Sequence, residues 1–244
     1  MRKIFAIIST PIYYVVFTTI LVVFQPIQFI CYNLFGYNAH KRSVDVLNIL
    51  LIRFLFVVGI FHRFNSFNKI PKNGPLIIIS NHQSAHDIPI LLWGFRKRHP
   101  KFIAKKELAK NHPSISYNLK KSKSAIIDRK DRVQAIEEIS RLGKYIEENS
   151  YSAVIFPEGT RSKTGKMRRF QVPGVEALLD NAPSAKVVPV AISGNYKLHT
   201  YGSFITGFGH LINATVLDCI ERKDKTASEI VKEAQQSIQN CLDA

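Results

Sequence analysis

Hydrophobic positions follow two patterns along the chain, one long apolar stretch near the N-terminus and short separate runs after about residue 70. The short runs are rich in β-branched residues and alternate with amphipathic segments, as βα units do. We therefore expect an α/β fold in which a mixed β-sheet is flanked by helices. The predicted strands cover residues 75–80, 125–127, 152–156 and 186–192, and residues 211–217 are expected at an edge of the sheet.

Two of the predicted helices have clear N-terminal signals. Asp131 can cap a helix in which apolar residues recur at helical spacing from Val133 to Ile146. Thr226 and Glu229 form a capping-box pattern in front of the last helix. Both helices have one apolar face, which we expect to belong to the core.

The N-terminal segment is apolar enough to enter a membrane. No Asp, Glu, Lys or Arg occurs between Ile4 and His40, and this stretch contains a run about as long as a bilayer core requires. A second apolar piece, residues 47–61, is interrupted by Arg53, whose guanidinium can reach the headgroups from an interfacial helix. We expect two embedded or interfacial helices in residues 1–62. A buried hairpin of a soluble core is the alternative.

Basic residues outnumber acidic ones by a wide margin. The 244 residues suit one α/β domain and include 34 Lys and Arg against 18 Asp and Glu, a formal charge of +16. Thirteen of these cations lie between Arg96 and Arg132, and a second cluster lies between Arg161 and Arg169. Such a surplus suits a polyanion, an anionic membrane or a phosphorylated substrate. Few aromatic residues are interleaved with the charges, so we favour the membrane and a phosphorylated ligand over nucleic acid.

Candidate chemistry begins where the first predicted strand ends, in the sequence "ISNHQSAHD" at residues 79–87. His82 and Asp87 are five residues apart, a spacing that separates two side chains on a regular helix by about 140°. They meet only if a turn intervenes, and Pro89 just after Asp87 favours a turn followed by a helix start. Asp87 would then orient the imidazole of His82 as a general base.

Two other interpretations of this stretch stay open. His82 and His86 have the spacing at which two imidazoles on one helix bind zinc, but the sequence offers no clear third ligand. We therefore expect no metal site. A polar turn that carries no chemistry is the second alternative.

Two further strand ends carry polar groups that suit a phosphate. "FPEGTRS" directly follows a predicted strand, and its polar part is Glu158, Gly159, Thr160 and Arg161. The glycine permits a close backbone approach to a ligand, and the planar fork of the arginine fits phosphate oxygens. Arg129 follows another short apolar run, beside Asp128. A structural turn with a solvated arginine and a surface ion pair are the respective alternatives.

Taken together, the strand ends resemble the motifs of the glycerolipid acyltransferases, most closely those of the bacterial-type 1-acylglycerol-3-phosphate acyltransferases. "NHQSAHD" resembles the NHxxxxD motif, and "AIIDR", "FPEGTRS" and "VVPVAI" resemble the second, third and fourth motifs, in the family's order. "AKKEL" at residues 104–108 is also similar, and the resemblance covers roughly residues 70–195. The chain departs from the family in lacking the glycine that commonly opens the second motif, and "RRFQVPGV" matches the segment after the third motif only loosely.

The resemblance implies that His82 removes the proton of a lysophospholipid hydroxyl while Asp87 orients it, and that the oxygen attacks an acyl thioester directly. His86 remains a structural neighbour. The residues implied to hold the glycerol phosphate are Lys105, Arg129, Glu158, Gly159, Thr160 and Arg161. No cofactor is expected, because acyl-coenzyme A or an acylated acyl carrier protein is a co-substrate.

The same resemblance assigns residues 63–244 to an acyltransferase domain that forms phosphatidic acid. We expect a site on the cytoplasmic face of a membrane, the inner membrane for the bacterial type, with membrane lipids and the lysophospholipid as partners. Glycerol 3-phosphate, an ornithine lysolipid or another lysophospholipid is the alternative acceptor. A non-enzymatic protein that binds anionic membranes or nucleic acid is the alternative function.

Overall fold

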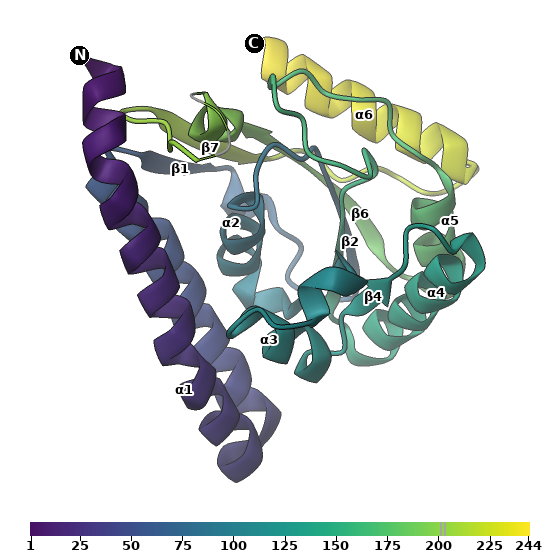
Figure 1. The fold of residues 1–244 in the computed structure, drawn as a ribbon. Coiled ribbons are helices and arrows are strands. Elements are labelled where there is room, and N and C mark those ends of the chain that lie inside the picture. Colours follow the sequence, from purple (N-terminus) through teal and green to yellow (C-terminus); the bar gives the residue numbers. More distant parts are fainter. Residues whose placement is uncertain (201, 203) are drawn as a thin grey trace.

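A seven-stranded β-sheet runs through the part of the chain that the computed structural model describes, which is residues 1–200, 202 and 204–244. Its strands lie in the order β1-β7-β6-β2-β5-β3-β4 (Figure 1). Their bounds are β1 Phe61–Asn65, β2 Leu76–Ser80, β3 Pro100–Lys105, β4 Ala125–Ile127, β5 Ser152–Ile155, β6 Lys186–Ser193 and β7 Leu211–Val216. The expected mixed α/β sheet is confirmed.

Most strands are parallel. β2 pairs in parallel with β5 and β6, β5 pairs with β3, and β3 with β4, whereas β6 and β7 are antiparallel. The strand expected at an edge, β7, is not an edge strand, because β1 pairs with its other side. The C-terminal ends of β2, β5 and β6 therefore meet at one edge of the sheet, where ligands of open α/β sheets commonly bind.

Two strands were not expected from the sequence, β1 and β3. β1 reads "FHRFN" and β3 reads "PKFIAK", so polar and charged residues interrupt the apolar run in each. β1 lies at the edge of the sheet, and Lys101 in β3 is buried. The burial of a lysine within a strand is the reason that the hydrophobic pattern fails at β3.

Helices cover both faces of the sheet, and Figure 1 shows α1 on one side and α4 to α6 on the other. The helices are α1 Arg2–Arg53, α2 Asp87–Gly94, α3 Ile115–Lys121, α4 Arg132–Asn149, α5 Pro173–Asn181 and α6 Ala227–Asp243. Short 3-10 turns are Phe54–Val58, Phe67–Lys69, Arg96–Arg98, Lys106–Ala109 and Asn195–His199. The expected caps are confirmed, since Asp131 accepts from the Gln134 N–H and Thr226 and Glu229 form a reciprocal capping box.

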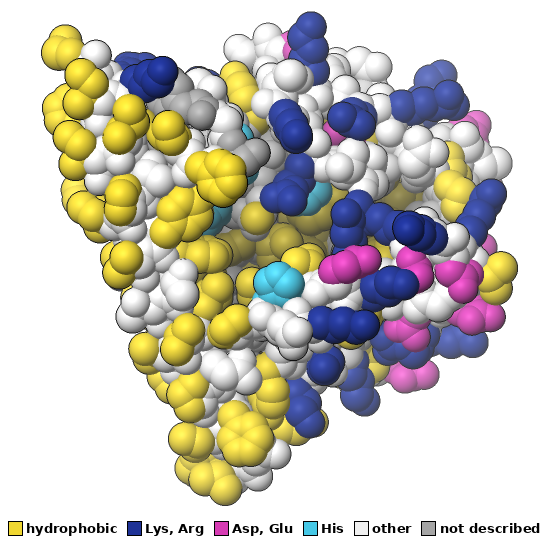
Figure 2. All heavy atoms as spheres, in the orientation of Figure 1, with side chains coloured by type: hydrophobic (Ala, Val, Ile, Leu, Met, Phe, Trp, Pro, Cys, Tyr) yellow, Lys and Arg dark blue, Asp and Glu magenta, His cyan; other side chains and the backbone are white. Residues whose placement is uncertain are grey.

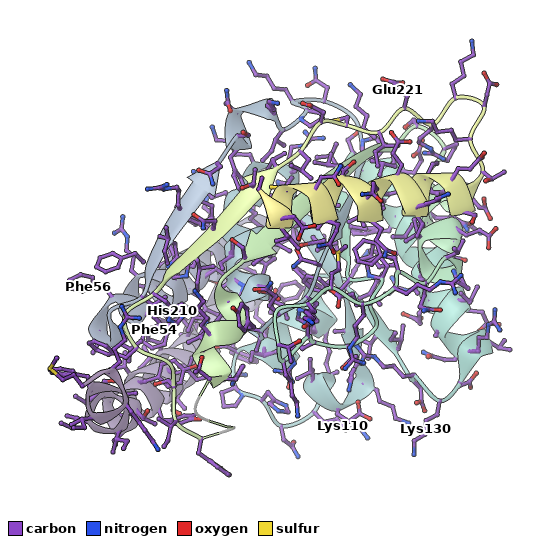
Figure 3. The ribbon with its side chains drawn as sticks, turned by 90° about the horizontal axis from the view of Figure 1, so that it is seen from above. Phe54, Phe56, Lys110, Lys130, His210 and Glu221 are labelled. Carbon is purple, nitrogen blue, oxygen red and sulfur yellow. The ribbon has the colours of Figure 1, made fainter. Side chains whose placement is uncertain are left out.

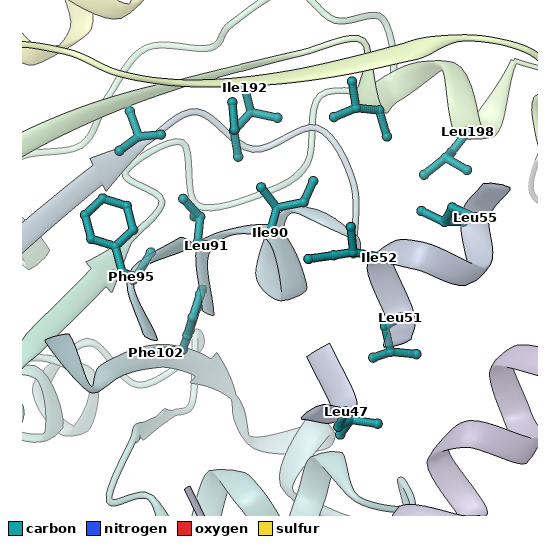
Figure 4. Close-up of a cluster of buried hydrophobic side chains, with 14 of the residues drawn as sticks. Leu47, Leu51, Ile52, Leu55, Ile90, Leu91, Phe95, Phe102, Ile192 and Leu198 are labelled. Atoms are coloured by element: carbon teal, nitrogen blue, oxygen red, sulfur yellow. The ribbon is translucent and has the colours of Figure 1, made fainter. Parts of the chain in front are cut away.

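Alternate residues of β2 face the two cores. Ile78 packs in the cluster that contains α1 and α2 side chains, and Ile77 packs in the cluster that contains α4, α5 and α6 side chains. Figure 4 shows the first cluster, in which Leu51 and Ile52 of α1 lie near Ile90 of α2. Because the N-terminal segment supplies part of this core, it forms one wall of the protein.

α1 consists of two helical arms that lie side by side (Figure 1). The break is at Gly36, where φ is 75° and ψ is −168°, a backbone conformation that glycine adopts without a steric penalty. The two expected helices are thus confirmed, although the second arm starts about ten residues before the apolar piece at 47–61 and ends at Arg53. Residue 62, the expected domain boundary, lies inside β1, and the division into two domains stays a prediction.

The outer face of α1 is strongly apolar. Its most apolar window has a mean hydropathy of 2.1 and is 22% buried, and the helix is long and apolar enough to cross a membrane. The large apolar side chains that it exposes include Ile4, Ile8, Val15, Phe29, Leu34 and Phe35, and Figure 2 shows apolar side chains along this whole flank. Such a surface is typical of a membrane-binding element.

Candidate active site

Two loops meet at the C-terminal edge of the sheet, one after β2 and one after β5. Their backbones are joined directly, because the Ser162 N–H donates to the carbonyl oxygen of His82 at 2.7 Å. A carboxylate oxygen of Glu158 accepts from the backbone N–H of His82, also at 2.7 Å. The first and third sequence motifs are therefore held together in one site.

His82 and Asp87 form the expected pair. The Nδ1 atom of His82 lies 2.7 Å from Oδ2 of Asp87, and the same oxygen accepts from the backbone N–H groups of Gln83 and Ser84 at 2.7 and 2.9 Å. These two bonds close a turn before α2, which confirms the turn predicted between His82 and Asp87. Asn195 donates from its side chain to the other carboxylate oxygen. Asp87 is fully buried, so its charge rests on these four donors.

The contact with Asp87 also selects a tautomer of His82. The carboxylate accepts a hydrogen bond from the Nδ1–H group, which leaves the Nε2 lone pair as the basic site of the ring. The ring stacks on Phe156, with the two centroids 4.0 Å apart and the planes at 13°. Stacking and the Asp87 contact together fix the orientation of the imidazole, and its side chain stays 12% exposed.

Glu158 accepts hydrogen bonds from both loops of the site. One of its carboxylate oxygens accepts from the His82 N–H and the other from the Arg168 N–H, at 2.7 and 3.0 Å. Burial raises the pKa of this carboxyl, against the two backbone bonds, which lower it. Both oxygens of Glu158 therefore accept from backbone donors that join the two loops, and the expectation that Glu158 helps to hold the glycerol phosphate stays a prediction.

The remaining residues expected to bind phosphate line one cavity together with His82. They are Lys105, Arg129, Gly159, Thr160 and Arg161. All three cations are exposed. Partial burial lowers the pKa of Arg129, the charge of Glu107 raises it and that of Arg161 lowers it, so the two guanidinium groups are electrostatic neighbours. Three cations on one cavity, against the single acid Glu107 that acts on Arg129, suit a phosphate group.

Gly159 and Asp128 come just before Thr160 and Arg129 in the sequence. Gly159 has a φ of 68°, and a side chain added to it would meet nothing within 4 Å, so its backbone conformation rather than a lack of space requires glycine. Asp128 forms its ion pair with Lys106 and not with Arg129. The alternative in which Arg129 is only the partner of a neighbouring aspartate does not match this arrangement.

His86 points away from the cationic side and into the core. It is 6% exposed, and its Nε2 lies 2.7 Å from the hydroxyl of Tyr13 in α1. Burial lowers its pKa to about 4, so it is neutral at pH 7. Among the described residues, no group of three or more His, Cys, Asp or Glu side chains is placed to hold a metal ion. His86 is the structural neighbour that was expected.

The cavity has a volume of about 680 Å³ and runs from the catalytic pair toward α1. Its apolar walls include Leu21, Leu47, Leu51, Leu92 and Phe102. Figure 2 shows a hollow with apolar side chains at its floor, between the apolar flank of α1 and a group of basic side chains. Figure 3 shows two cations of that basic region, Lys110 and Lys130, pointing outward at one edge of the protein.

Several site residues escaped the sequence interpretation. Asn195, after β6, donates to Asp87, and the Gln83 side chain accepts from the Asn195 N–H at 2.9 Å. Asn81 makes two hydrogen bonds of 2.8 Å with the backbone of Ile192. The sequence signal that could have found Asn195 is its position shortly after the predicted strand at 186–192, because ligands of open α/β sheets bind at the ends of strands.

The fold and this site define an acyltransferase, and the chain belongs to the acyltransferase family. Residues 63–193, more than half of the chain, match the profile of the family described as Acyltransferase. This segment contains all four motifs and both catalytic candidates.

The relatives carry more specific names. A coconut (Cocos nucifera) protein named 1-acyl-sn-glycerol-3-phosphate acyltransferase is 32% identical over 125 residues, 51% of this chain and 39% of that protein. One with the same name from Pseudomonas aeruginosa is 32% identical over 135 residues, 55% of this chain and 50% of that protein. The matched part thus spans half or less of the length of these relatives.

A solved structure shares the whole fold. It is the crystal structure of the 1-acyl-sn-glycerophosphate (LPA) acyltransferase PlsC from Thermotoga maritima, with a TM-score of 0.81 and 24% sequence identity. The similarity covers 100% of this chain and 97% of that one, so it includes the two arms of α1.

Proposed function

We propose that this chain transfers an acyl group from an acyl thioester to the free hydroxyl of 1-acylglycerol 3-phosphate and thereby forms phosphatidic acid. One observation carries the proposal. The His82–Asp87 pair lies at a cavity that has Arg129 and Arg161 on one side and apolar walls inside. The names of the coconut and Pseudomonas relatives agree with this acceptor.

In the proposed reaction His82 acts as a general base. Its Nε2 takes the proton of the acceptor hydroxyl while the oxygen attacks the thioester carbonyl. The carbon–sulfur bond then breaks, and the leaving thiolate takes the same proton back from the imidazolium. Asp87 stabilises the imidazolium that forms in between, and its buried position holds the ring in place for the attack. No acyl-enzyme and no cofactor are needed.

The two substrates would occupy chemically different parts of the cavity. The acceptor phosphate is placed against Lys105, Arg129 and Arg161, which are exposed on the wall of the cavity nearest His82. The acyl chain of the donor is placed along the apolar walls, since burying methylene groups there contributes about 0.8 kcal/mol each. The donor is a thioester of coenzyme A or of acyl carrier protein.

We place the site at a membrane surface, on the cytoplasmic face of a bacterial inner membrane. The apolar flank of α1 borders the hollow that leads to His82, so a lipid acceptor enters from the layer in which that flank is buried. The wall of the cavity that carries the cations is then close to the headgroups.

The full chain with 1-acylglycerol 3-phosphate and an acyl thioester is expected to release free thiol and form phosphatidic acid. The His82→Ala variant is expected to lose about 10³-fold in kcat, because it removes the base. Lys97→Met serves as a control, since Lys97 is exposed and lies outside the cavity lining. A His82→Ala variant that is folded and as fast as the wild type would refute the mechanism.

A further inference from the structure

The cavity extends far beyond the catalytic pair, along the second arm of α1. Tyr37, His40, Val44, Leu47 and Leu51 all line it. At a rise of 1.5 Å per residue, the roughly 14 residues from Tyr37 to Leu51 span about 21 Å. Leu51 packs in the same cluster as α2, the helix that starts at the catalytic aspartate, so Tyr37 marks the distal end of the cavity.

This distal end is polar, although the walls that lead to it are apolar. The ammonium group of Lys101 donates to the hydroxyl of Tyr37 at 2.7 Å, and that hydroxyl lies 2.9 Å from Nδ1 of His99. The same ammonium lies over the rings of Tyr37 and Tyr151, 4.7 and 5.1 Å from their centroids. Lys101 is only 2% exposed, so water does not solvate it. A lysine in this position serves no step of the proposed reaction.

A second polar group at this end lacks a partner. His40 is 1% exposed and lines the cavity, and its Nε2 makes no hydrogen bond with any of the described residues. Burial and the charges of Lys101 and Lys121 lower its pKa, so the imidazole is neutral at pH 7. His40 is therefore close enough to Lys101 for the two groups to interact electrostatically. A buried polar atom without a partner costs about 1 to 3 kcal/mol, which favours a ligand that supplies one.

A hydroxyl group matches this pair of side chains. Tyr37 takes one donor hydrogen of Lys101, which leaves at least one for a ligand whether the amine is charged or neutral, and a neutral imidazole nitrogen can accept. The oxygen of a hydroxyl group accepts a hydrogen bond from Lys101, and its O–H donates one to the imidazole of His40. A terminal methyl group can do neither. Carboxylates fit less well, since they have no proton to donate to His40.

We propose that Lys101 and His40 form a specificity site for an acyl thioester whose chain carries a hydroxyl at its far end. The inference rests on the function proposed above, because it places the donor's chain in this cavity. An extended palmitoyl chain is comparable in length with the span from Leu51 to Tyr37, so the ω-hydroxypalmitoyl thioester is the test ligand.

The test is a competition between palmitoyl-coenzyme A and ω-hydroxypalmitoyl-coenzyme A on the full chain, with 1-acylglycerol 3-phosphate as acceptor. We expect the wild type to favour the hydroxylated donor about tenfold in kcat/KM, the usual size of one hydrogen bond to a charged group. Lys101→Met is expected to bring the ratio to one or below and to raise the rate with palmitoyl-coenzyme A. His40→Phe is expected to lower the ratio as well.

Two further variants keep the outcomes apart. Lys97→Met, the same substitution at an exposed position four residues earlier, is expected to keep the wild-type ratio. If Lys101→Met does not fold, Tyr37→Phe removes the hydroxyl that holds the ammonium and is expected to lower the ratio. Transfer from both donors at equal efficiency would overturn this inference alone, and no transfer from either donor would overturn the proposed function and this inference with it.

Discussion

At the end of the cavity beside His82 the cations are exposed, whereas at the distal end Lys101 is 2% exposed and its ammonium contacts two tyrosine rings. Arg129 and Arg161 are exposed to water, so their charges cost the fold little, and the proposed function assigns them to the acceptor phosphate. Lys101 has lost its water permanently. The same type of charge therefore serves recognition at one end and destabilises the fold at the other unless a ligand compensates it.

The buried anion of the site differs from the buried cation in its hydrogen bonds. Asp87 is as buried as Lys101, but it accepts four hydrogen bonds, one of them from Nδ1 of His82 at 2.7 Å. A buried charge is tolerated when its hydrogen bonds are complete. The difference between Asp87 and Lys101 is thus one of pairing, and substitutions at each end test it.

The largest effect is expected for Asp87→Asn. An amide presents one acceptor oxygen where the carboxylate uses two, so the tautomer of His82 and the turn through Gln83 both lose support. We expect kcat to fall on the order of 10³-fold and the free energy of unfolding to fall by about 2 kcal/mol. Steady-state kinetics and urea unfolding measure the two effects.

Asn195→Ala is the matched comparison for that variant, since it removes a single donor from the other oxygen of Asp87. A loss of about tenfold in kcat is expected, the size of one hydrogen bond to a charged group. Equal losses in the two variants would mean that Asp87 acts only as a structural anchor.

Arg161→Ala tests the exposed cations. If Arg161 binds the acceptor phosphate as proposed, KM for the phosphorylated acceptor is expected to rise about tenfold while kcat changes little. Added salt is expected to raise KM of the wild type and to have less effect on the variant. An acceptor without phosphate, 1-acylglycerol, is the control substrate, and an equal rise in its KM would contradict the assignment.

Much of this arrangement could be predicted from the sequence where hydrophobic pattern and local chemistry agree. The apolar run before His82, the spacing to Asp87 and the caps at Asp131 and Thr226 each carry their own physical reason within a few residues. Those elements formed where they were expected. The family resemblance then added the order of the motifs.

The remainder depends on contacts between distant segments. β3 was missed because Lys101 breaks its pattern, and that lysine is buried in contact with Tyr37 and Tyr151, which come from distant segments. The resemblance assigned Glu158 to the glycerol phosphate, and the contact of its carboxylate with the His82 N–H, 76 residues away, could not be predicted from the sequence. Asn195 lies 108 residues from Asp87, a distance at which sequence spacing says nothing about contact.

The pH dependence of stability gives the smallest and most direct test of the buried lysine. Burial, and then the charges of Lys41 and Lys123, lower the pKa of Lys101 from 10.5 to about 7. Between these values the unfolded chain binds more protons than the folded one, so the contribution of Lys101 to stability rises with pH. Relative to Lys101→Met, the wild type is expected to gain about 1 kcal/mol in free energy of unfolding between about pH 7 and pH 8.

Urea unfolding of both proteins in the same detergent at each pH measures this difference. The difference from Lys101→Met removes the titration that is the same in both proteins, and the titratable groups around the lysine are Lys41, Lys123, His40, His99, Asp45, Tyr37 and Tyr151. Lys97→Met, whose lysine is exposed, is expected to show no such trend. A flat difference for Lys101→Met would mean that the ammonium keeps its proton and its partners in the fold, and the contrast between the two ends of the cavity would then be one of geometry alone.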